Sequence, residues 1–558
     1  MMSEALAKWF AEYKNSSSYK TQLERPIAYF SAEYAVNDEL PIYAGGLGIL
    51  AGDYLREAAD QEIPLIAVGL YYSEGFIRKE LSPEGKVVEA HEPKRAEEAG
   101  LTPVVDEKGV RVTVCVPIQD REVNIRAWLL TIGKVKLYLL DTRLDSNSPS
   151  DQHITDKLYT TEKETRLKQE MVLGIGGLRM LEALKYHPSF YHLNEGHSAF
   201  LAYELIRHEM KEHGYDFAKA LEIAKSKMLF TNHTLVAAGN DVYSNDLVSL
   251  HLEKFAEQMP APVQQLVSMG LVQQSSTFSM TILAMRCAGK INAVSKLHAT
   301  KAKDIWADHP MTPITNGIHV PTWDKVKVDN LIWDKHVENK RILLNYITEK
   351  TGVMWDDKPL IVGWGRRIVR YKRPLALVER LKRFGEIARN EQRPLRVVFA
   401  GLSHPADIDG GEILEELRYR LTSDLKGVAV YLPHYNMELS AKMVAGCDVW
   451  LNTPVVGYEA CGTSGMKAAL NGNLPLSTRD GWVAEIETLG VGWAVEDTEV
   501  TDSILDRLEQ DILPLYYDLD VEGKPAKWIT MMRNAREMIM NDFAMSRALK
   551  QYLELISS

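Results

Sequence analysis

Short apolar runs that end in glycine or polar residues recur along the chain and alternate with amphipathic helical segments. The first unit joins an apolar run at 27–31 to a glycine-rich turn, a helix through about Gln61 and a second apolar run at 64–71. Strand, glycine turn, helix and strand in this order form the βαβ unit of a phosphate-binding parallel sheet. The pattern therefore predicts an α/β fold with helices packed on parallel sheets.

The alternation of strands and helices occurs in two series, separated by a pause near residue 325. Because 558 residues exceed one hydrophobic core, we expect two doubly wound, Rossmann-like domains that face a cleft. The first is expected at 1–320, with an antiparallel β insertion at about 72–143 where polar and apolar residues alternate. The second is expected at 321–530, and a terminal helix at 531–558 is expected to pack back on the first.

Composition narrows the class of protein. The formal net charge of -11 argues against nucleic acid or an anionic membrane as a partner. None of the four cysteines forms a CxxC pair and most lie in apolar runs, as in a reduced, cytoplasmic protein. No apolar run approaches the roughly 20 residues of a membrane span, and no pattern of metal ligands is found. We therefore expect a cytoplasmic enzyme or binding protein without a metal.

The segment at 459–472 carries the strongest indication of a site. A loop of small residues at 462–465 follows an apolar run at 447–452 and opens a helix. The unpaired N–H groups and the positive dipole end of such a helix suit a phosphate. We expect Lys467 in the first turn, where the dipole lowers its pKa and favours Schiff-base chemistry on a phosphorylated aldehyde. The alternative is a surface lysine after a flexible loop.

Other polar clusters also follow apolar runs. A second glycine turn lies at 45–48, and asparagine or histidine clusters lie at 194–197, 231–234 and 315–319. Five cations stand in eight positions at 366–373. Ligands bind at the carboxyl edge of parallel sheets, so these clusters are expected to meet there. Each could instead be structural: a tight turn, capping residues or a solvated basic face.

Taken together, these motifs resemble those of the α-glucan (glycogen, starch and maltodextrin) phosphorylases. The motifs appear in the family's order and span most of residues 26–480: Ser31-Ala32-Glu33-Tyr34, Gly45 to Gly48, Asn194 to His197, Thr231 to Thr234, Thr315 to Ile318, Arg366 to Arg373, Tyr435, and Glu459 to Gly472. The resemblance implies the two-domain glycosyltransferase-B fold and pyridoxal 5′-phosphate as cofactor.

The resemblance also implies a role for each matching residue. Lys467 is similar to the lysine that forms the Schiff base with the cofactor. The other cofactor-binding residues implied are Thr463, Ser464, Arg366, Tyr435 and Trp323. The substrate phosphate is expected at Gly46, Arg367 and Lys372. The glucosyl unit is expected at Asn316, Glu459, Cys461, Gly462, Leu47 and His197, with His233 beside it. Catalysis is expected to depend on Lys467, Arg367, Lys372, Glu459 and His233.

The activity implied is reversible phosphorolysis of an α-1,4-glucan by inorganic phosphate to α-glucose 1-phosphate, with retention. The family's cofactor is thought to relay a proton through its 5′-phosphate. Homodimers are common in the family, and the short chain leads us to expect no allosteric switch. Two alternatives stay open: a nucleotide-sugar glycosyltransferase of the same fold, similar to glycogen synthase, which needs no lysine at 467, and a non-catalytic glucan-binding protein.

Overall fold

The structure is a computed structural model. It describes residues 2–37, 39–76, 78–81, 87–90, 95–235, 240–272, 275–404, 407–433 and 435–558, with 78–81 and 87–90 described for their backbone only.

The larger of two sheets, the first sheet, has ten strands among the described residues, in the order β14-β13-β10-β9-β1-β2-β8-β7-β5, with β6 also paired to β7. Its strands are β1 (Ile27–Ser31), β2 (Leu65–Leu70), β5 (Thr102–Pro103), β6 (Thr113–Ile118), β7 (Arg121–Ile132), β8 (Val135–Asp141), β9 (Phe190–Asn194), β10 (Met228–Asn232), β13 (Lys290–Ala293) and β14 (Thr312–Pro313). The path from β14 to β8 is parallel, and β5, β6 and β8 pair antiparallel with β7.

The second sheet has six strands among the described residues, all parallel, in the order β17-β16-β15-β18-β19-β20. Its strands are β15 (Leu360–Gly365), β16 (Leu395–Ala400), β17 (Ala429–Leu432), β18 (Val449–Asn452), β19 (Leu474–Thr478) and β20 (Trp493–Val495). Two short pairs lie outside both sheets: β3 (Arg78–Leu81) with β4 (Val87–Ala90), and β11 (Val242–Ser244) with β12 (Thr277–Ser279).

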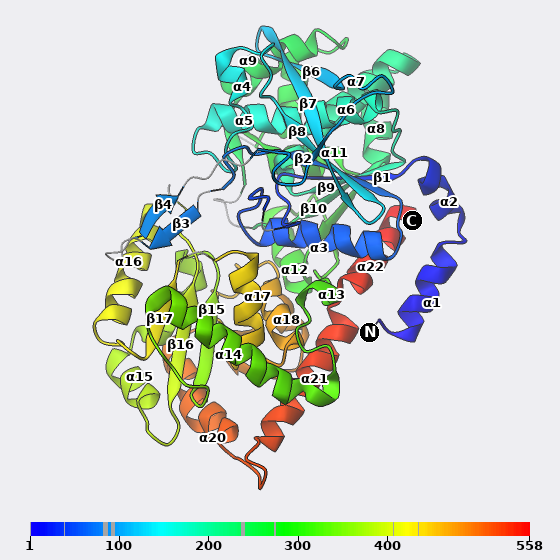
Figure 1. Cartoon of the computed structure of the whole chain (residues 1–558). Coiled ribbons are helices and arrows are strands. Elements are labelled where there is room, and N and C mark those ends of the chain that lie inside the picture. Colours follow the sequence, from blue (N-terminus) through cyan, green and yellow to red (C-terminus); the bar gives the residue numbers. More distant parts are fainter. Residues whose placement is uncertain are drawn as a thin grey trace.

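Helices surround both sheets (Figure 1). Those before the second sheet are α1 (Glu4–Tyr13), α2 (Ser17–Glu24), α3 (Gly46–Asp60), α4 (Pro149–Gln152), α5 (Lys163–Met171), α6 (Gly177–Ala183), α7 (Leu201–His213), α8 (Phe217–Ser226), α9 (Asn245–Ala256), α10 (Val263–Gly270), α11 (Met280–Cys287), α12 (Lys296–Ile305), α13 (Val320–Trp323) and α14 (Ile332–Thr351). The later helices are α15 (Leu381–Ala388), α16 (Ile408–Thr422), α17 (Met437–Gly446), α18 (Thr463–Leu470), α19 (Val500–Asp506), α20 (Leu513–Tyr516), α21 (Ala526–Asp542) and α22 (Met545–Ser557).

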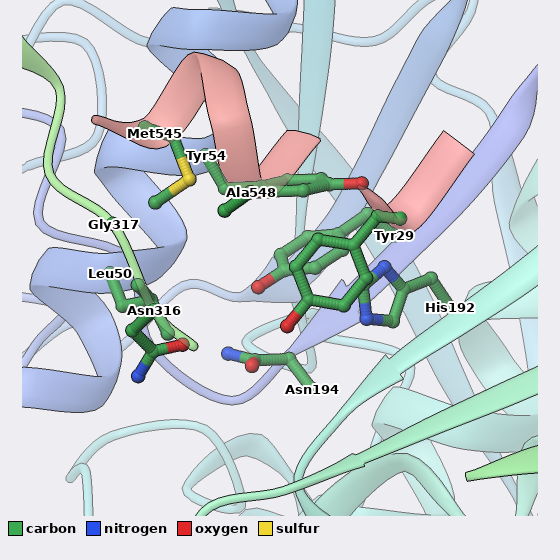
Figure 2. Close-up of a pocket in the computed structure, with 10 residues that line it drawn as sticks. Tyr29, Leu50, Tyr54, His192, Asn194, Asn316, Gly317, Met545 and Ala548 are labelled. Atoms are coloured by element: carbon green, nitrogen blue, oxygen red, sulfur yellow. The ribbon is translucent and has the colours of Figure 1, made fainter. Parts of the chain in front are cut away.

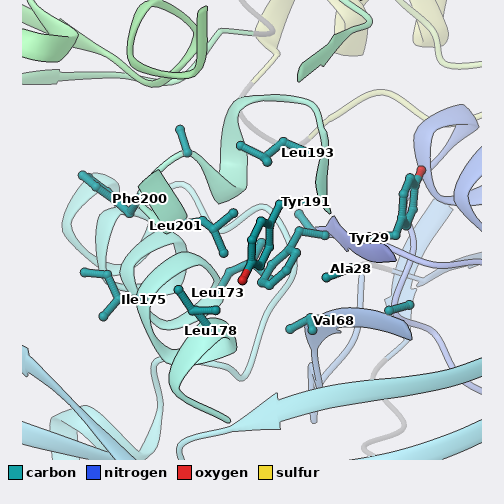
Figure 3. Packing of buried hydrophobic residues seen from close by; sticks show 14 of the residues in the cluster. Ala28, Tyr29, Val68, Leu173, Ile175, Leu178, Tyr191, Leu193, Phe200 and Leu201 are labelled. Atoms are coloured by element: carbon teal, nitrogen blue, oxygen red, sulfur yellow. The ribbon is translucent and has the colours of Figure 1, made fainter. Parts of the chain in front are cut away.

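Each sheet has its own hydrophobic core. Every residue of β1, β2, β9, β10 and β15 is buried, as expected for parallel strands covered on both faces. Figure 3 shows residues of the first core, which includes Val68 and Leu193 from the sheet and Leu173 and Leu178 from the helical segment at 163–183. The second core is built around the second sheet. The prediction of an α/β fold with parallel sheets is thus confirmed.

The antiparallel strands expected at about 72–143 do not stand beside the first sheet. β8 pairs in parallel with β2, and β7 pairs with β8, so these strands extend the sheet itself. The sequence pattern identifies alternating strands but not their pairing partners. Residues 77, 82–86 and 91–94 of this region lie outside the described residues.

The chain returns from the second core to the first at its C-terminal end. A single terminal helix is expected at 531–558, but the structure divides this segment between α21 and α22, with a break at 543–544. Trp528 and Met532 on α21 belong to the second core, whereas Leu549 on α22 belongs to the first. Figure 1 shows α22 beside α3.

A buried ion pair holds α14 to the second sheet. Lys340 Nζ donates hydrogen bonds to Asp448 Oδ2 at 2.7 Å, to the Pro359 carbonyl at 2.7 Å and to the Tyr516 hydroxyl at 2.9 Å. His336 Nε2 lies 2.9 Å from Asp448 Oδ1. Burial alone would raise the pKa of Asp448, but Lys340 and His336 outweigh it and lower the pKa below its ordinary value. Removing the lysine would therefore leave a buried carboxylate without its ammonium partner.

We predict that Lys340→Met lowers the free energy of unfolding by about 3–5 kcal/mol, because one partner of a buried pair is lost. Lys335→Met, on the same helix, is the matched control: its pair with Glu338 is exposed and is worth less than about 1 kcal/mol. Urea denaturation at neutral pH measures both variants. Equal losses in the two variants would contradict the stabilising role of the buried pair.

Candidate active site

Arg366 lies at the carboxyl end of β15, beside the N-terminus of α18. The guanidinium is buried, and its NH1 donates to Asn452 Oδ1 and lies 3.5 Å from Glu459 Oε2. Among the described residues, Arg366 Nε and NH2 and Asn452 Nδ2 have no hydrogen-bond partner. A Cβ added to Gly462, which precedes α18, would lie 3.6 Å from Asn452 Nδ2. Unpartnered donors are thus gathered at the start of α18.

Glu459 is the anion of this cluster. Lys372 Nζ donates to Glu459 Oε2 at 2.6 Å, and both side chains are 13% exposed. Burial would raise the pKa of Glu459, but Lys372, Arg366 and Arg367 together hold it below its ordinary value. Glu459 is therefore ionised at neutral pH.

Arg367 lies next to this cluster but is exposed. Within the described part of the chain it makes no hydrogen bond or ion pair, although its charge acts on Glu459. It is a cation available to a ligand. Tyr435 packs against Gly365, where a Cβ would meet its hydroxyl at 2.8 Å, and burial raises the pKa of Tyr435. Tyr435 thus lies beside Arg366.

Lys467 is buried at 3% exposure and is the fifth residue of α18, so its expected place in the first turn is wrong. Its pKa is indeed lowered, to about 8, but burial is the main cause. The ammonium lies 4.2 Å from the centroid of the Trp323 ring, a cation–π contact. Lys467 Nζ makes no hydrogen bond to the described residues, so the buried amine is available to a ligand.

A phosphorylated aldehyde fits the residues present. Its phosphate oxygens would satisfy the free donors of Arg366 and Asn452 and the N–H groups at the start of α18, where Thr463 and Ser464 also lie. Trp450 Nε1 donates to Ser464 Oγ at 3.3 Å, which fixes that side chain. The aldehyde would meet an amine whose pKa of about 8 leaves part of it unprotonated near neutral pH.

Asp53, on α3, is a residue that the sequence analysis missed. It is 1% exposed and its carboxylate accepts from Trp323 Nε1 at 3.0 and 2.9 Å and from the His319 backbone N–H at 3.3 Å. Its charge also acts on Lys467. An aspartate amid a helix carries no motif, and only its position on the buried face of α3 could have indicated it.

The glycine turn that opens α3 lies near the start of α17. The Met437 N–H donates to the Tyr43 hydroxyl at 3.1 Å, so the turn lies near Tyr435. A Cβ at Gly45 or Gly46 would meet nothing within 4 Å, whereas one at Gly48 would lie 2.6 Å from Tyr43 Cβ. Packing explains glycine at 48 but not at 46, where the open space suits a ligand approaching the backbone. Leu47 is half-buried beside it.

His233 follows β10 and meets Asn194 at the end of β9. His233 Nε2 lies 2.6 Å from Asn194 Oδ1, and the His233 N–H donates to Glu195 Oε2 at 2.8 Å. Burial and neighbouring histidines lower the pKa of His233 to about 3. It is therefore neutral near pH 7, able to donate and accept hydrogen bonds but not to carry charge.

Asn316 and Cys461 meet at the junction of the sheets. The Asn316 backbone acts on the Cys461 thiol, whose pKa is raised by burial. Arg547 on α22 donates to the Asn316 carbonyl at 3.1 Å and fixes the loop. Asn194 reaches towards Asn316 in a small pocket whose wall includes Tyr552 from α22 (Figure 2). The structure thus brings together residues expected at a glucosyl unit.

His197 does not line this pocket, although its charge acts on His233. It is buried, lies 5.8 Å from the Tyr159 ring by centroids and has Nε2 3.5 Å from Asp241 Oδ2. Burial lowers its pKa to about 4. Its neighbour Tyr159 donates to Glu33 Oε1 at 2.8 Å, and Glu33 Oε2 accepts from the Gly45 N–H at 3.2 Å. His197 is thus connected to the glycine turn through two other side chains.

The described residues offer neither a metal site nor a membrane-spanning helix. They contain no group of three or more histidine, cysteine, aspartate or glutamate side chains placed to hold a metal ion. Of the helices described, none combines the length and apolar character needed to cross a membrane.

Comparison with known proteins identifies the family. The model of the carbohydrate phosphorylases matches residues 160–323 and 321–493. A maltodextrin phosphorylase of Thermococcus litoralis is 36% identical, covering 99% of this chain and 73% of its own. Glycogen phosphorylases of Aquifex aeolicus and Mycobacterium tuberculosis are each 32% identical, covering 96% and 98% of this chain and 87% and 72% of their own. The matched segments contain Arg366, Glu459 and Lys467. The chain therefore belongs to the carbohydrate phosphorylase family.

Proposed function

We propose that the protein is an α-1,4-glucan phosphorylase that carries pyridoxal 5′-phosphate on Lys467. It converts a glucan and inorganic phosphate reversibly, with retention, to α-glucose 1-phosphate and a shortened chain. The observation that carries this proposal is that unpartnered donors of Arg366 lie near the start of α18 while the buried amine of Lys467 lies in the second turn of the same helix. A nucleotide-sugar transferase of similar fold would need no lysine there.

Three groups hold the cofactor in this proposal. Arg366, Thr463 and Ser464 bind its phosphate, Lys467 holds its aldehyde carbon, and Trp323 and Tyr435 form aromatic walls. When bound, the cofactor supplies a phosphate that can donate and accept a proton beside the substrate phosphate. Two phosphates at close range repel strongly in a site of low dielectric constant. The cations of 366–373 offset that repulsion.

Inorganic phosphate binds to Arg367 and Lys372, with the Gly46 N–H as a further donor. Arg367 is exposed, and its planar guanidinium can donate two parallel hydrogen bonds to one phosphate. Lys372 is paired with Glu459 in the structure, so phosphate must share or displace that contact. This exchange leaves Glu459 free to face the glucosyl unit.

The glucosyl unit lies between Glu459 and the residues at the ends of β9 and β10. Because cations keep the pKa of Glu459 low, its carboxylate stays ionised and stabilises the positive charge that develops at the reacting carbon. Neutral His233, together with Asn316, orients the sugar by hydrogen bonds. The backbone groups of Cys461 and Gly462 complete the contact.

The two sheets correspond, in this proposal, to the two halves of a glycosyltransferase-B fold. Residues 1–320 with α22 form the glucan side, and the second sheet with α21 forms the cofactor and phosphate side. The four cysteines are unpaired, which is consistent with a reducing compartment such as the cytoplasm.

We predict that Lys372→Ala lowers phosphate-dependent release of glucose 1-phosphate from maltoheptaose by at least about 100-fold, because a cation on the reacting phosphate is lost. Cofactor content, measured by absorbance, should stay near that of the wild type. Arg370→Ala is the control, since Arg370 lies in the same basic segment but is exposed and paired with Asp409. Activity of Lys372→Ala within a few-fold of wild type would reject the phosphate assignment.

A second prediction concerns the cofactor itself. Borohydride treatment of the purified protein should fix pyridoxal phosphate to the peptide that contains Lys467, because reduction makes the link at that nitrogen permanent. Mass spectrometry of the digest locates the added mass. Lys467→Arg should carry no label. Labelling of another lysine, or activity on a nucleotide sugar without any cofactor, would contradict the proposal.

A further inference from the structure

Helix α3 of the first βαβ unit buries a carboxylate against Trp323 of the second core. Both carboxylate oxygens of Asp53, on α3, accept from Trp323 Nε1, and Oδ2 also accepts from the His319 backbone N–H. Arg56, one turn later, has its NH1 3.5 Å from Asp53 Oδ1. The carboxylate is 1% exposed, and the free-energy cost of burying it is offset by these hydrogen bonds and by nearby positive charge.

Trp323 connects this carboxylate to Lys467. Its indole N–H binds Asp53, while the face of the same ring lies 4.2 Å below the Lys467 ammonium. The orientation that Asp53 gives to the indole therefore decides where the ring face meets Lys467. Asp53 lies on the first sheet's helix α3 and Lys467 on the second sheet's helix α18, so the contact crosses the junction between the two cores.

The charged groups that act on Asp53 and Lys467 come from α3, α18 and His319. Asp53 and Arg56, both on α3, are the charges that act on Lys467. Lys467, Arg56 and His319 act on Asp53 in turn. Burial raises the pKa of Asp53 despite these cations. Asp53 is thus the anion that acts on Lys467, and Arg56 opposes it.

We propose that Asp53 is a positioning residue for the cofactor: its carboxylate is the charge partner of the Lys467 nitrogen and holds the Trp323 ring against it. This inference rests on the proposed attachment of pyridoxal 5′-phosphate to Lys467. Attachment joins the Lys467 nitrogen to the aldehyde carbon and releases the aldehyde oxygen as water. The step requires the unprotonated amine, so the anion that stabilises the ammonium sets the pH at which attachment occurs.

The sign of the effect follows from the charges. An anion near an ammonium raises the pKa of that ammonium, by about 1 unit or more at short range in a buried site. Asp53→Asn keeps the shape and one acceptor oxygen, which Trp323 Nε1 can still bind, but removes the charge. The pKa of Lys467, about 8 in the wild type, should then fall, and the amine should react at lower pH.

The test follows pyridoxal 5′-phosphate uptake by cofactor-depleted full-length protein, through absorbance, over a series of pH values. We expect the midpoint of the attachment rate in Asp53→Asn to lie about 1 unit or more below that of the wild type. Asp60→Asn is the matched control: Asp60 lies on the same helix, is 53% exposed and pairs with His319. Its midpoint should equal that of the wild type.

The outcomes distinguish failure of the proposed function from failure of the inference about Asp53 alone. If the wild-type protein takes up no pyridoxal phosphate at Lys467, both the proposed function and this inference fail. If uptake is normal and the midpoint in Asp53→Asn is unchanged, or shifts equally in Asp60→Asn, only the inference fails. Should Asp53→Asn not fold by circular dichroism, Arg56→Gln replaces it: loss of the opposing cation should raise the midpoint, and an unchanged or lower midpoint overturns the inference.

Discussion

The burial of positive charge where the two sheets meet is the constraint on which the rest of the site depends. Arg366 and Lys467 are both almost fully buried, yet Arg366 Nε and NH2 lack partners among the described residues, and Lys467 Nζ lies over the Trp323 ring and makes no hydrogen bond to a described residue. Unpaired buried charge is costly. A bound anion would compensate this buried positive charge. A phosphate at the start of α18 has the charge and the acceptor oxygens to do so.

α3 makes the site dependent on both sheets at once. Its first residues include Gly46, open to a ligand, and its middle carries Asp53, bound to Trp323. The C-terminal helix α22 adds a second connection, because Arg547 binds the Asn316 loop from the first core. Residues from distant parts of the chain thus converge, and a change in how the sheets meet would alter cofactor and glucosyl contacts together.

The sequence predicted much of this site because its residues follow buried strands. Strands such as β15 are apolar along their whole length. The end of the apolar run therefore locates the strand end, and with it Arg366. The pairing of β8 with β2, the break at 543–544 and the second-turn position of Lys467 could not be predicted. They depend on tertiary contacts that apolar periodicity does not encode. Asp53 was missed because its partners lie some 270 residues away along the chain.

A crystal structure of the protein with pyridoxal 5′-phosphate and inorganic phosphate tests the central claim most directly. The account predicts continuous density from Lys467 Nζ to the cofactor, with cofactor phosphate oxygens within hydrogen-bond distance of Arg366 Nε and NH2. Inorganic phosphate should then lie between that group and Arg367. An unmodified Lys467, or a cofactor phosphate bound away from Arg366, would contradict it.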